Sequence, residues 1–137
     1  MVNCDNFGFF DYVDGELDDR YEYTSDEYGE ILQGLIGDGV LKSVGDALQC
    51  EISGGEVIVN TGAAYAGGKI GIIKIAKSVS IPALESGYNC AYRVVFRADR
   101  SARVVGIDII AGTPTTDEPT APNLTRTETI FELGLCR

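Results

Sequence analysis

The chain has 137 residues, 45% of them apolar, and a net charge of −10 from 21 Asp and Glu residues against 11 Lys and Arg residues. These values fit one globular domain with a sizeable core. The acidic balance repels phosphate backbones and anionic membranes, so we expect no nucleic-acid partner. The absence of histidine excludes Ser-His-Asp and Cys-His catalysis and histidine-ligated metal sites.

No apolar run reaches the roughly eighteen residues of a transmembrane helix, so we expect no membrane insertion. The N-terminus is acidic and lacks the basic region of a secretory signal peptide. The four cysteines are scattered and form no C-x-x-C pair; three disulfide pairings are possible, but we expect all four to be reduced: Cys4, Cys50, Cys90 and Cys136.

Residues 1–23 combine aromatic and acidic side chains without a helical or strand period. The aromatic residues are Phe7, Phe9, Phe10, Tyr12, Tyr21 and Tyr23. Residues 5–30 hold ten Asp and Glu residues against Arg20. We interpret this segment as a solvated acidic arm, with a docking arm for a basic partner or a loose calcium site as alternatives. The acidic residues between Asp11 and Asp19 do not follow the EF-hand pattern, so we expect no metal.

A helix is predicted from about residue 25 to residue 37. Thr24 and Glu27 have capping-box spacing, and Gly37 and Gly39 supply the stop. The apolar residues recur at helical spacing and predict one buried stripe: Tyr28, Ile31, Leu32, Leu35 and Ile36. A helix this short must dock on another part of the protein.

From about residue 46 the apolar period changes to two, which indicates strands. Gly54 and Gly55 predict a hairpin turn, and Gly67 and Gly68 fit a hairpin better than a phosphate-binding loop, because a strand follows them. A long strand is then expected, with a bulge near Lys77 and these residues on one face: Ile73, Ile75, Val79 and Ile81. Later strands are expected around residues 90–98, 105–109 and 131–135, and residues 112–123 form a Pro/Thr-rich loop.

Strands at this spacing favour a β-sandwich or an open barrel. We expect a mainly β fold, in which an N-terminal arm and one short helix pack on an antiparallel β-sandwich. Residues 1–42 would form the arm and helix and residues 43–137 the sandwich, as one compact unit.

Five short patterns, in this order, carry a resemblance that spans about residues 10 to 136. They are Phe10, Val13, Gly15, Arg20 and Tyr21; Gly39 and Val40; Gly62, Ala63 and Gly67; Arg93, Val94, Val95, Arg97 and Asp99; and a final run from Gly112, Thr113 and Pro114 through Pro122, Leu124 and Arg126 to Phe131, Glu132 and Leu133. In this order the chain resembles the N-terminal module of phage tail and baseplate proteins from prophages of Gram-positive gut and dairy bacteria. No catalytic or cofactor residue comes with this resemblance.

The resemblance implies a virion structural protein of the distal tail or baseplate, made in the host cytoplasm, that acts as an adaptor for host attachment. We therefore expect no enzyme activity and no cofactor, although purely carboxylate chemistry such as glycoside hydrolysis stays open. The alternative is a module that binds host-surface glycans, with Tyr65 or Tyr88 stacking on sugars.

The aromatic residues of the arm predict self-association. A short acidic segment cannot bury them alone, and exposed they would form an apolar patch. We expect a homo-oligomer that also binds other tail proteins. A trimer is favoured because the resemblance to tail proteins implies repetition around a threefold or sixfold axis. The residues expected in subunit contacts are Phe7, Phe9, Phe10 and Tyr12.

Overall fold

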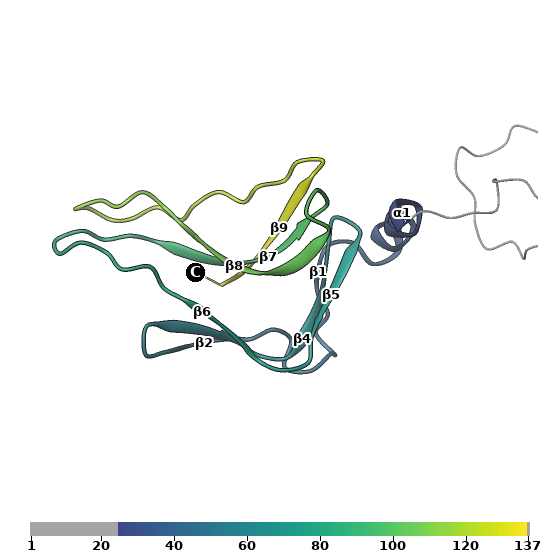
Figure 1. Ribbon diagram of the computed structural model, residues 1–137, viewed down its shortest axis with the longest axis horizontal. Coiled ribbons are helices and arrows are strands. Elements are labelled where there is room, and N and C mark those ends of the chain that lie inside the picture. The colour runs from purple at the N-terminus through teal and green to yellow at the C-terminus, as the bar shows by residue number, and fades with distance from the viewer. Residues whose placement is uncertain (1–24, 137) are drawn as a thin grey trace, which may run out of the picture.

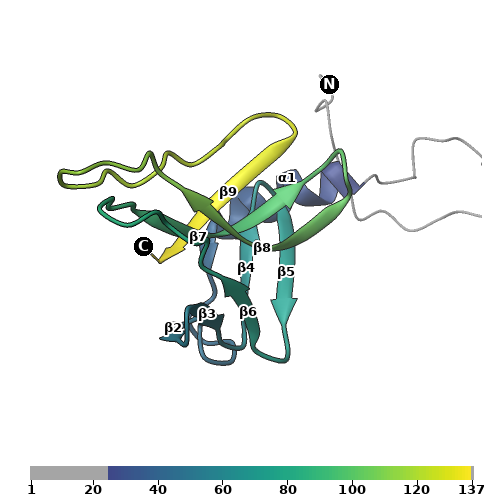
Figure 2. The same cartoon turned by 60° about the vertical axis from the view of Figure 1, so that its left-hand side comes forward.

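The computed structural model describes residues 25–136, which form one helix and nine strands (Figures 1 and 2). The elements are α1 (Ser25–Ile36), β1 (Gly39–Val40), β2 (Cys50–Ser53), β3 (Glu56–Val59), β4 (Gly62–Ala66), β5 (Lys69–Ile73), β6 (Lys77–Ser80), β7 (Tyr92–Asp99), β8 (Val104–Ala111) and β9 (Ile130–Cys136). They make three antiparallel sheets, with the orders β1-β4-β5, β2-β3-β6 and β8-β7-β9. The predicted mainly β fold with one short helix is confirmed.

The helix α1 has the predicted bounds to within one residue. Asp26 and Glu27 lie in its first turn, where the helix dipole favours acidic side chains. It ends because Gly37 takes a left-handed conformation, with φ of 75°, and donates its N–H to the carbonyl of Gln33 at 2.8 Å.

Two of the sheets are halves of one sharply bent hairpin. β4 pairs with β5 across the turn at Gly67 and Gly68, and β3 continues the hairpin by pairing with β6. Between the pairs Gly62–Ile73 and Val59–Lys77, two residues on one side oppose three on the other. The extra residue bends the ladder as a bulge does.

The sheet β8-β7-β9 packs against this bent hairpin. Its strand β7 lies in the middle, and the inner residues Val94, Phe96 and Ala98 join the core. The core partners on the hairpin are Val57, Val59, Ala64 and Ala66, together with Leu48 from the turn before β2. In Figure 1, β2-β3-β6 and β8-β7-β9 face each other at one end, while α1 lies at the other end beyond β1-β4-β5.

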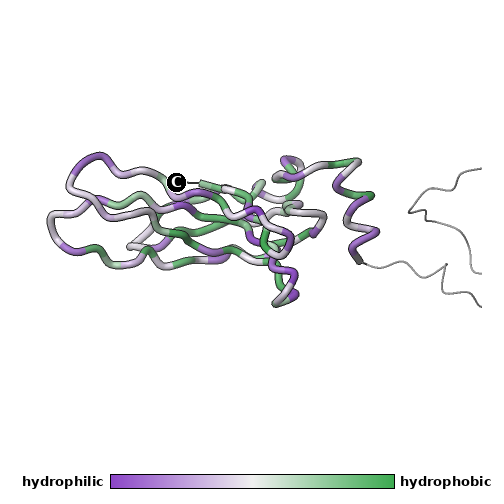
Figure 3. Tube along the Cα trace, turned by 90° about the horizontal axis from the view of Figure 1, so that it is seen from above, coloured by the Kyte–Doolittle hydropathy of each residue, from purple (hydrophilic) through white to green (hydrophobic). Residues whose placement is uncertain are grey.

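The outer face of β8-β7-β9 is also covered. Val95 faces away from the core on β7 yet is fully buried. The segment before β9 folds back over this face, since Leu124 lies next to Gly134 and Thr125 pairs with Glu132. Figure 3 shows apolar and polar residues interspersed along the strands.

Two sequence-based expectations are wrong in detail. The long strand after Gly68 is broken at residues 74–76, so β5 and β6 belong to different sheets and Ile75 at the bend is 76% exposed. The helical stripe is buried only in part, because Leu35 is 79% exposed and Ile36 and Tyr28 are also exposed. The helix also contacts the turn between β4 and β5 through its small residue Gly29, which lies against Gly68.

Candidate functional site

The turn between β4 and β5 contacts α1, the residues that follow α1 and the turn between β7 and β8. The N–H of Gly67 donates to Asp38 Oδ1 at 2.7 Å, and Arg100 Nη2 donates to the Gly67 carbonyl at 3.0 Å. Gly29 and Gly68 touch so closely that a Cβ on either would lie 2.8 Å from the carbonyl oxygen of the other. The start of α1, the start of β5 and the β7–β8 turn therefore meet at one place.

A pocket of about 540 Å³ opens at this meeting point. We name it the cationic pocket, and its lining is Asp26, Lys69, Asp99, Arg100, Arg103, Val104 and Val105. Lys69 Nζ lies 2.9 Å from Asp26 Oδ1. This hydrogen bond, together with the positive charge of Lys69, holds the pKa of Asp26 below its usual value. The pair is exposed, so its main effect is to position the two charges rather than to stabilise the fold.

The backbone of the β7–β8 turn fixes where Arg103 stands. Asp99 Oδ1 accepts the N–H of Ala102 at 2.9 Å, and the N–H of Arg100 donates to the Thr129 carbonyl at 2.8 Å. Arg103 takes a left-handed conformation, with φ of 57°. A side chain there costs roughly 1–2 kcal/mol that glycine would avoid, so the fold carries a strained cation at the pocket.

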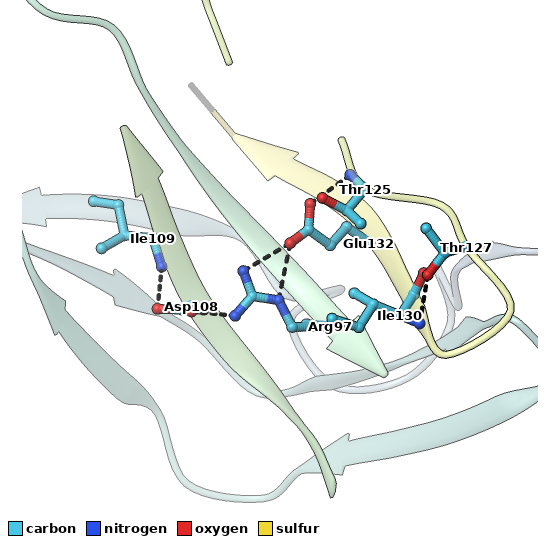
Figure 4. Close-up of polar contacts among 7 residues, drawn as sticks. All are labelled: Arg97, Asp108, Ile109, Thr125, Thr127, Ile130 and Glu132. Atoms are coloured by element: carbon cyan, nitrogen blue, oxygen red, sulfur yellow. Dashed lines mark hydrogen bonds and ion pairs between the residues drawn. The ribbon is translucent and has the colours of Figure 1, made fainter. Parts of the chain in front are cut away.

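A charged network lies on the outer face of β8-β7-β9 (Figure 4). Arg97 on β7 donates from Nε and Nη2 to Glu132 Oε1, at 2.8 and 2.7 Å, and from Nη1 to Asp108. The other oxygen of Glu132 accepts the N–H of Thr125 at 2.7 Å, and Glu132 is 2% exposed. Partial burial opposes the charge of Arg97, but its hydrogen bond to Glu132 and the nearby charge of Asp108 together raise its pKa.

This network links all three strands of the sheet to the segment that covers it. Both Asp108 oxygens are used, because Oδ1 accepts the N–H of Ile109 at 2.8 Å. Among the described residues, no buried side-chain N or O atom lacks a hydrogen-bond partner. The arrangement is a satisfied clamp of the kind that fixes a sheet register.

Three thiols line a groove of about 580 Å³ at the end opposite the helix: Cys50, Cys90 and Cys136. All three are free cysteines, whereas Cys4 lies outside the described residues. Burial, with the neighbouring Cys136 thiol, raises the pKa of Cys50 to about 12. Cys50 is therefore a neutral thiol at physiological pH, and such a thiol is a poor nucleophile.

A hollow of about 640 Å³ lies within the Pro/Thr-rich loop, and Thr113, Thr115, Thr120 and Asn123 give it hydroxyl and amide groups. Asn89 holds the loop to the segment before β7 by pairing with Thr115. The two tyrosines considered for sugar stacking differ, since Tyr65 is 8% exposed and Tyr88 is 46% exposed. Tyr65 is therefore unsuited to stacking on a ligand, whereas Tyr88 is accessible.

Residues Phe7, Phe9, Phe10 and Tyr12, predicted to make subunit contacts, lie outside the described residues, as do the acidic residues considered for calcium. Sequence patterns missed the cationic pocket and the Arg97 clamp. The alternation of Arg93 and Arg97 with apolar residues placed both on the outer face of a strand, but it gave no signal that another segment covers that face.

The described residues leave many large apolar side chains exposed. They are Tyr28, Leu35, Ile36, Ile52, Ile70, Ile72, Ile75, Leu84, Tyr88, Val104 and Val105. Ile70 and Ile72 alternate with the inward-facing Gly71 and so lie on the outer face of β5. Neighbouring exposed apolar residues on one strand face, such as Ile70 and Ile72, are of the kind that another protein covers.

The site and fold define a small mainly β module with exposed apolar side chains on several elements and a cationic pocket. Comparison with protein-family models, curated proteins and solved structures finds no match to this chain. Within residues 25–136, no three His, Cys, Asp or Glu side chains are arranged to hold a metal ion. No helix in that part of the chain is long and apolar enough to cross a membrane.

Proposed function

We propose that the protein is a structural module of a phage or prophage distal tail, which assembles with copies of itself and with other tail proteins as an adaptor for host attachment. The observation that carries this proposal is the group of exposed apolar side chains on α1 and β5. On α1 and β5 alone, Leu35, Ile36, Ile70 and Ile72 are exposed. A surface of this kind suits a protein that works inside an assembly.

The order of sequence patterns supports the particular kind of assembly. The resemblance to tail and baseplate modules includes the stretch of β7 from Arg93 to Asp99 and the closing run through Glu132. In this chain Arg97 and Glu132 are partners in the clamp of β7 and β9. We infer that these residues keep the module rigid, so that its surfaces can bind neighbouring subunits.

Self-association through the arm is part of the proposal. The aromatic residues Phe7, Phe9, Phe10 and Tyr12 would contact a neighbouring subunit. A trimer is favoured because the tail proteins that the chain resembles repeat around a threefold or sixfold axis. Light scattering of the full chain between about 1 and 100 μM should give an oligomer, and replacing these four residues by serine should give a monomer. A monomeric wild type across this range would contradict self-association.

The virion role has a separate test. Tail genes cluster, so we expect the gene for this chain to lie among genes for other tail proteins, and antibodies against it should label purified particles at the tail tip. A gene among metabolic enzymes, or a particle that lacks the protein, would contradict the virion role even if the chain oligomerises.

A second candidate is a module that binds host-surface glycans. The hollow lined by Thr113, Thr115, Thr120 and Asn123, beside the strand-like pairing of Asn89, is the observation that favours it. The polar groups of this hollow suit hydroxyl-rich ligands. Tyr88, which directly precedes Asn89, is exposed. A structural adaptor should give no saturable signal on a glycan array. Binding that Thr115→Val and Tyr88→Ala abolish would favour this candidate.

A further inference from the structure

We propose that the cationic pocket of one subunit binds the acidic aromatic arm, residues 1–24, of a second copy. This inference rests on the self-association proposed above and adds the surface on which the arm docks. Three arguments carry it: the charge of the pocket, its apolar rim and the position at which the arm joins the body.

The cationic pocket concentrates positive charge on a module that is acidic as a whole. It gathers Lys69, Arg100 and Arg103, three of the nine Lys and Arg residues between residues 25 and 136, beside two Asp residues. The same range has fourteen Asp and Glu residues, so the surface outside the pocket is strongly negative. The arm offers seven acidic residues against Arg20: Asp5, Asp11, Asp14, Glu16, Asp18, Asp19 and Glu22. Opposite charges of this kind steer and orient association.

Apolar side chains border the cations. Val104 is 57% exposed, and Val105 is also exposed. In the arm, Phe9 and Phe10 precede Asp11, and Tyr12 follows it. A segment that alternates rings with carboxylates can place rings on the valines and carboxylates on the guanidinium groups. Rings beside Arg100 and Arg103 would add cation–π attraction.

The join between arm and body favours a second copy over the arm's own subunit. The arm enters the body at Ser25, next to Asp26, which already pairs with Lys69 on the pocket wall. To return Phe10 to that same pocket, residues 13–24 would have to close a loop back to the start of α1. That stretch carries five acidic residues and one Arg, and like charges extend a linker. Repulsion among these charges opposes closing the loop, which favours docking on a second copy.

Charge reversal on the full-length chain tests the pocket. Arg103→Glu should weaken self-association at least about tenfold, and the matched exposed control Lys74→Glu should change it less than about twofold. Raising NaCl from about 50 to 500 mM should weaken the wild type and have little effect on Arg103→Glu. Thermal melting of each variant verifies that it folds. The neutral variant Arg103→Gln should weaken self-association less than Arg103→Glu, and it tests the pocket if the charge-reversed variant misfolds.

Crosslinking identifies the occupant. A benzophenone amino acid at position 10, in a mixture of ¹⁴N and ¹⁵N protein, should crosslink to the peptide with Val104 and Val105 of the other isotope. If every crosslink joins peptides of the same isotope, the arm contacts its own subunit and the inference is overturned. Crosslinks only to the groove of Cys50 and Cys136 would also overturn it.

The two proposals fail in different ways. If the serine variants of the arm dissociate the oligomer but Arg103→Glu and salt do not, self-association stands and the pocket is not the docking surface. If the wild type is monomeric at about 100 μM, self-association fails, and the pocket inference fails with it.

Discussion

Glu132 and Arg97 form a cross-strand pair in which one partner is buried and the other reaches solvent. Glu132 accepts two hydrogen bonds from Arg97, at 2.8 and 2.7 Å, while its side chain is 3% exposed against 29% for Arg97. The two residues stand opposite each other on β9 and β7. The pair thus joins the central strand to the last strand of the chain at a point covered by the preceding loop.

We expect Glu132→Gln to destabilise the protein by about 2–3 kcal/mol, less than the roughly 3–5 kcal/mol of fully buried pairs because Arg97 is partly solvated. Both carboxylate oxygens accept hydrogen bonds, from Arg97 and from the Thr125 N–H. The amide has one acceptor oxygen, so its NH₂ group would face a donor. Urea unfolding measures the change. The control Glu128→Gln is exposed and should stay within about 0.5 kcal/mol of the wild type; equal effects would contradict the clamp.

Two glycines of α1 should respond oppositely to alanine. Gly34→Ala should stabilise the protein by up to about 1 kcal/mol, since nothing lies within 4 Å of its added Cβ and alanine favours the helix. Gly29→Ala should destabilise it, because the added Cβ would lie 2.8 Å from the Gly68 carbonyl oxygen. Thermal unfolding of both variants checks this matched pair. A gain at both positions would mean that α1 does not dock on the β4–β5 turn.

Arg103→Gly should stabilise the fold, whatever it does to self-association. Glycine relieves the left-handed strain at φ of 57° but makes the unfolded chain more flexible, which leaves a net gain of about 0.5–1 kcal/mol. The melting temperature should rise by a few degrees. The neighbour Ala102 is not among the positive-φ residues, so Ala102→Gly should lower stability by a similar amount. A drop for Arg103→Gly would show that its side chain stabilises the monomer.

Cys50 should resist alkylation in the folded protein. With a pKa of about 12, its thiolate fraction at pH 8 is about a thousandfold below that of an ordinary cysteine. Iodoacetamide labelling, read by peptide mass spectrometry, should be slower by that order in the native protein than in urea. Native labelling at the unfolded rate would contradict the burial of the thiol.

The same shift has a consequence for stability at alkaline pH. The pKa of Cys50 is raised on folding, so its contribution is present below the unfolded value of about 8.5 and is lost as pH rises toward about 12. The urea midpoint should fall between pH 8 and pH 10.5, and this fall should be larger for the wild type than for Cys50→Ala. Parallel falls in both proteins would indicate that other groups control the alkaline loss.

Local signals in the sequence determined several elements correctly. The helix at Ser25–Ile36 follows from its apolar period, its acidic first turn and Gly37. The hairpin turns at Gly54 and Gly67 follow from glycines placed between alternating strands. These features depend on residues close together in the chain, where backbone conformation and side-chain period decide the structure.

Only the tertiary structure decided which surfaces are covered. Ile52 follows the period of the buried Leu48 yet is 78% exposed, because β2 is an edge strand that extends beyond the core. Glu132 reads as a surface charge yet is buried, because the loop before β9 folds over it. The cationic pocket combines residues from α1, β5 and the β7–β8 turn, up to 79 residues apart between Asp26 and Val105. Burial and clustering depend on contacts between distant segments, and a local period carries no information about which segment will lie on top.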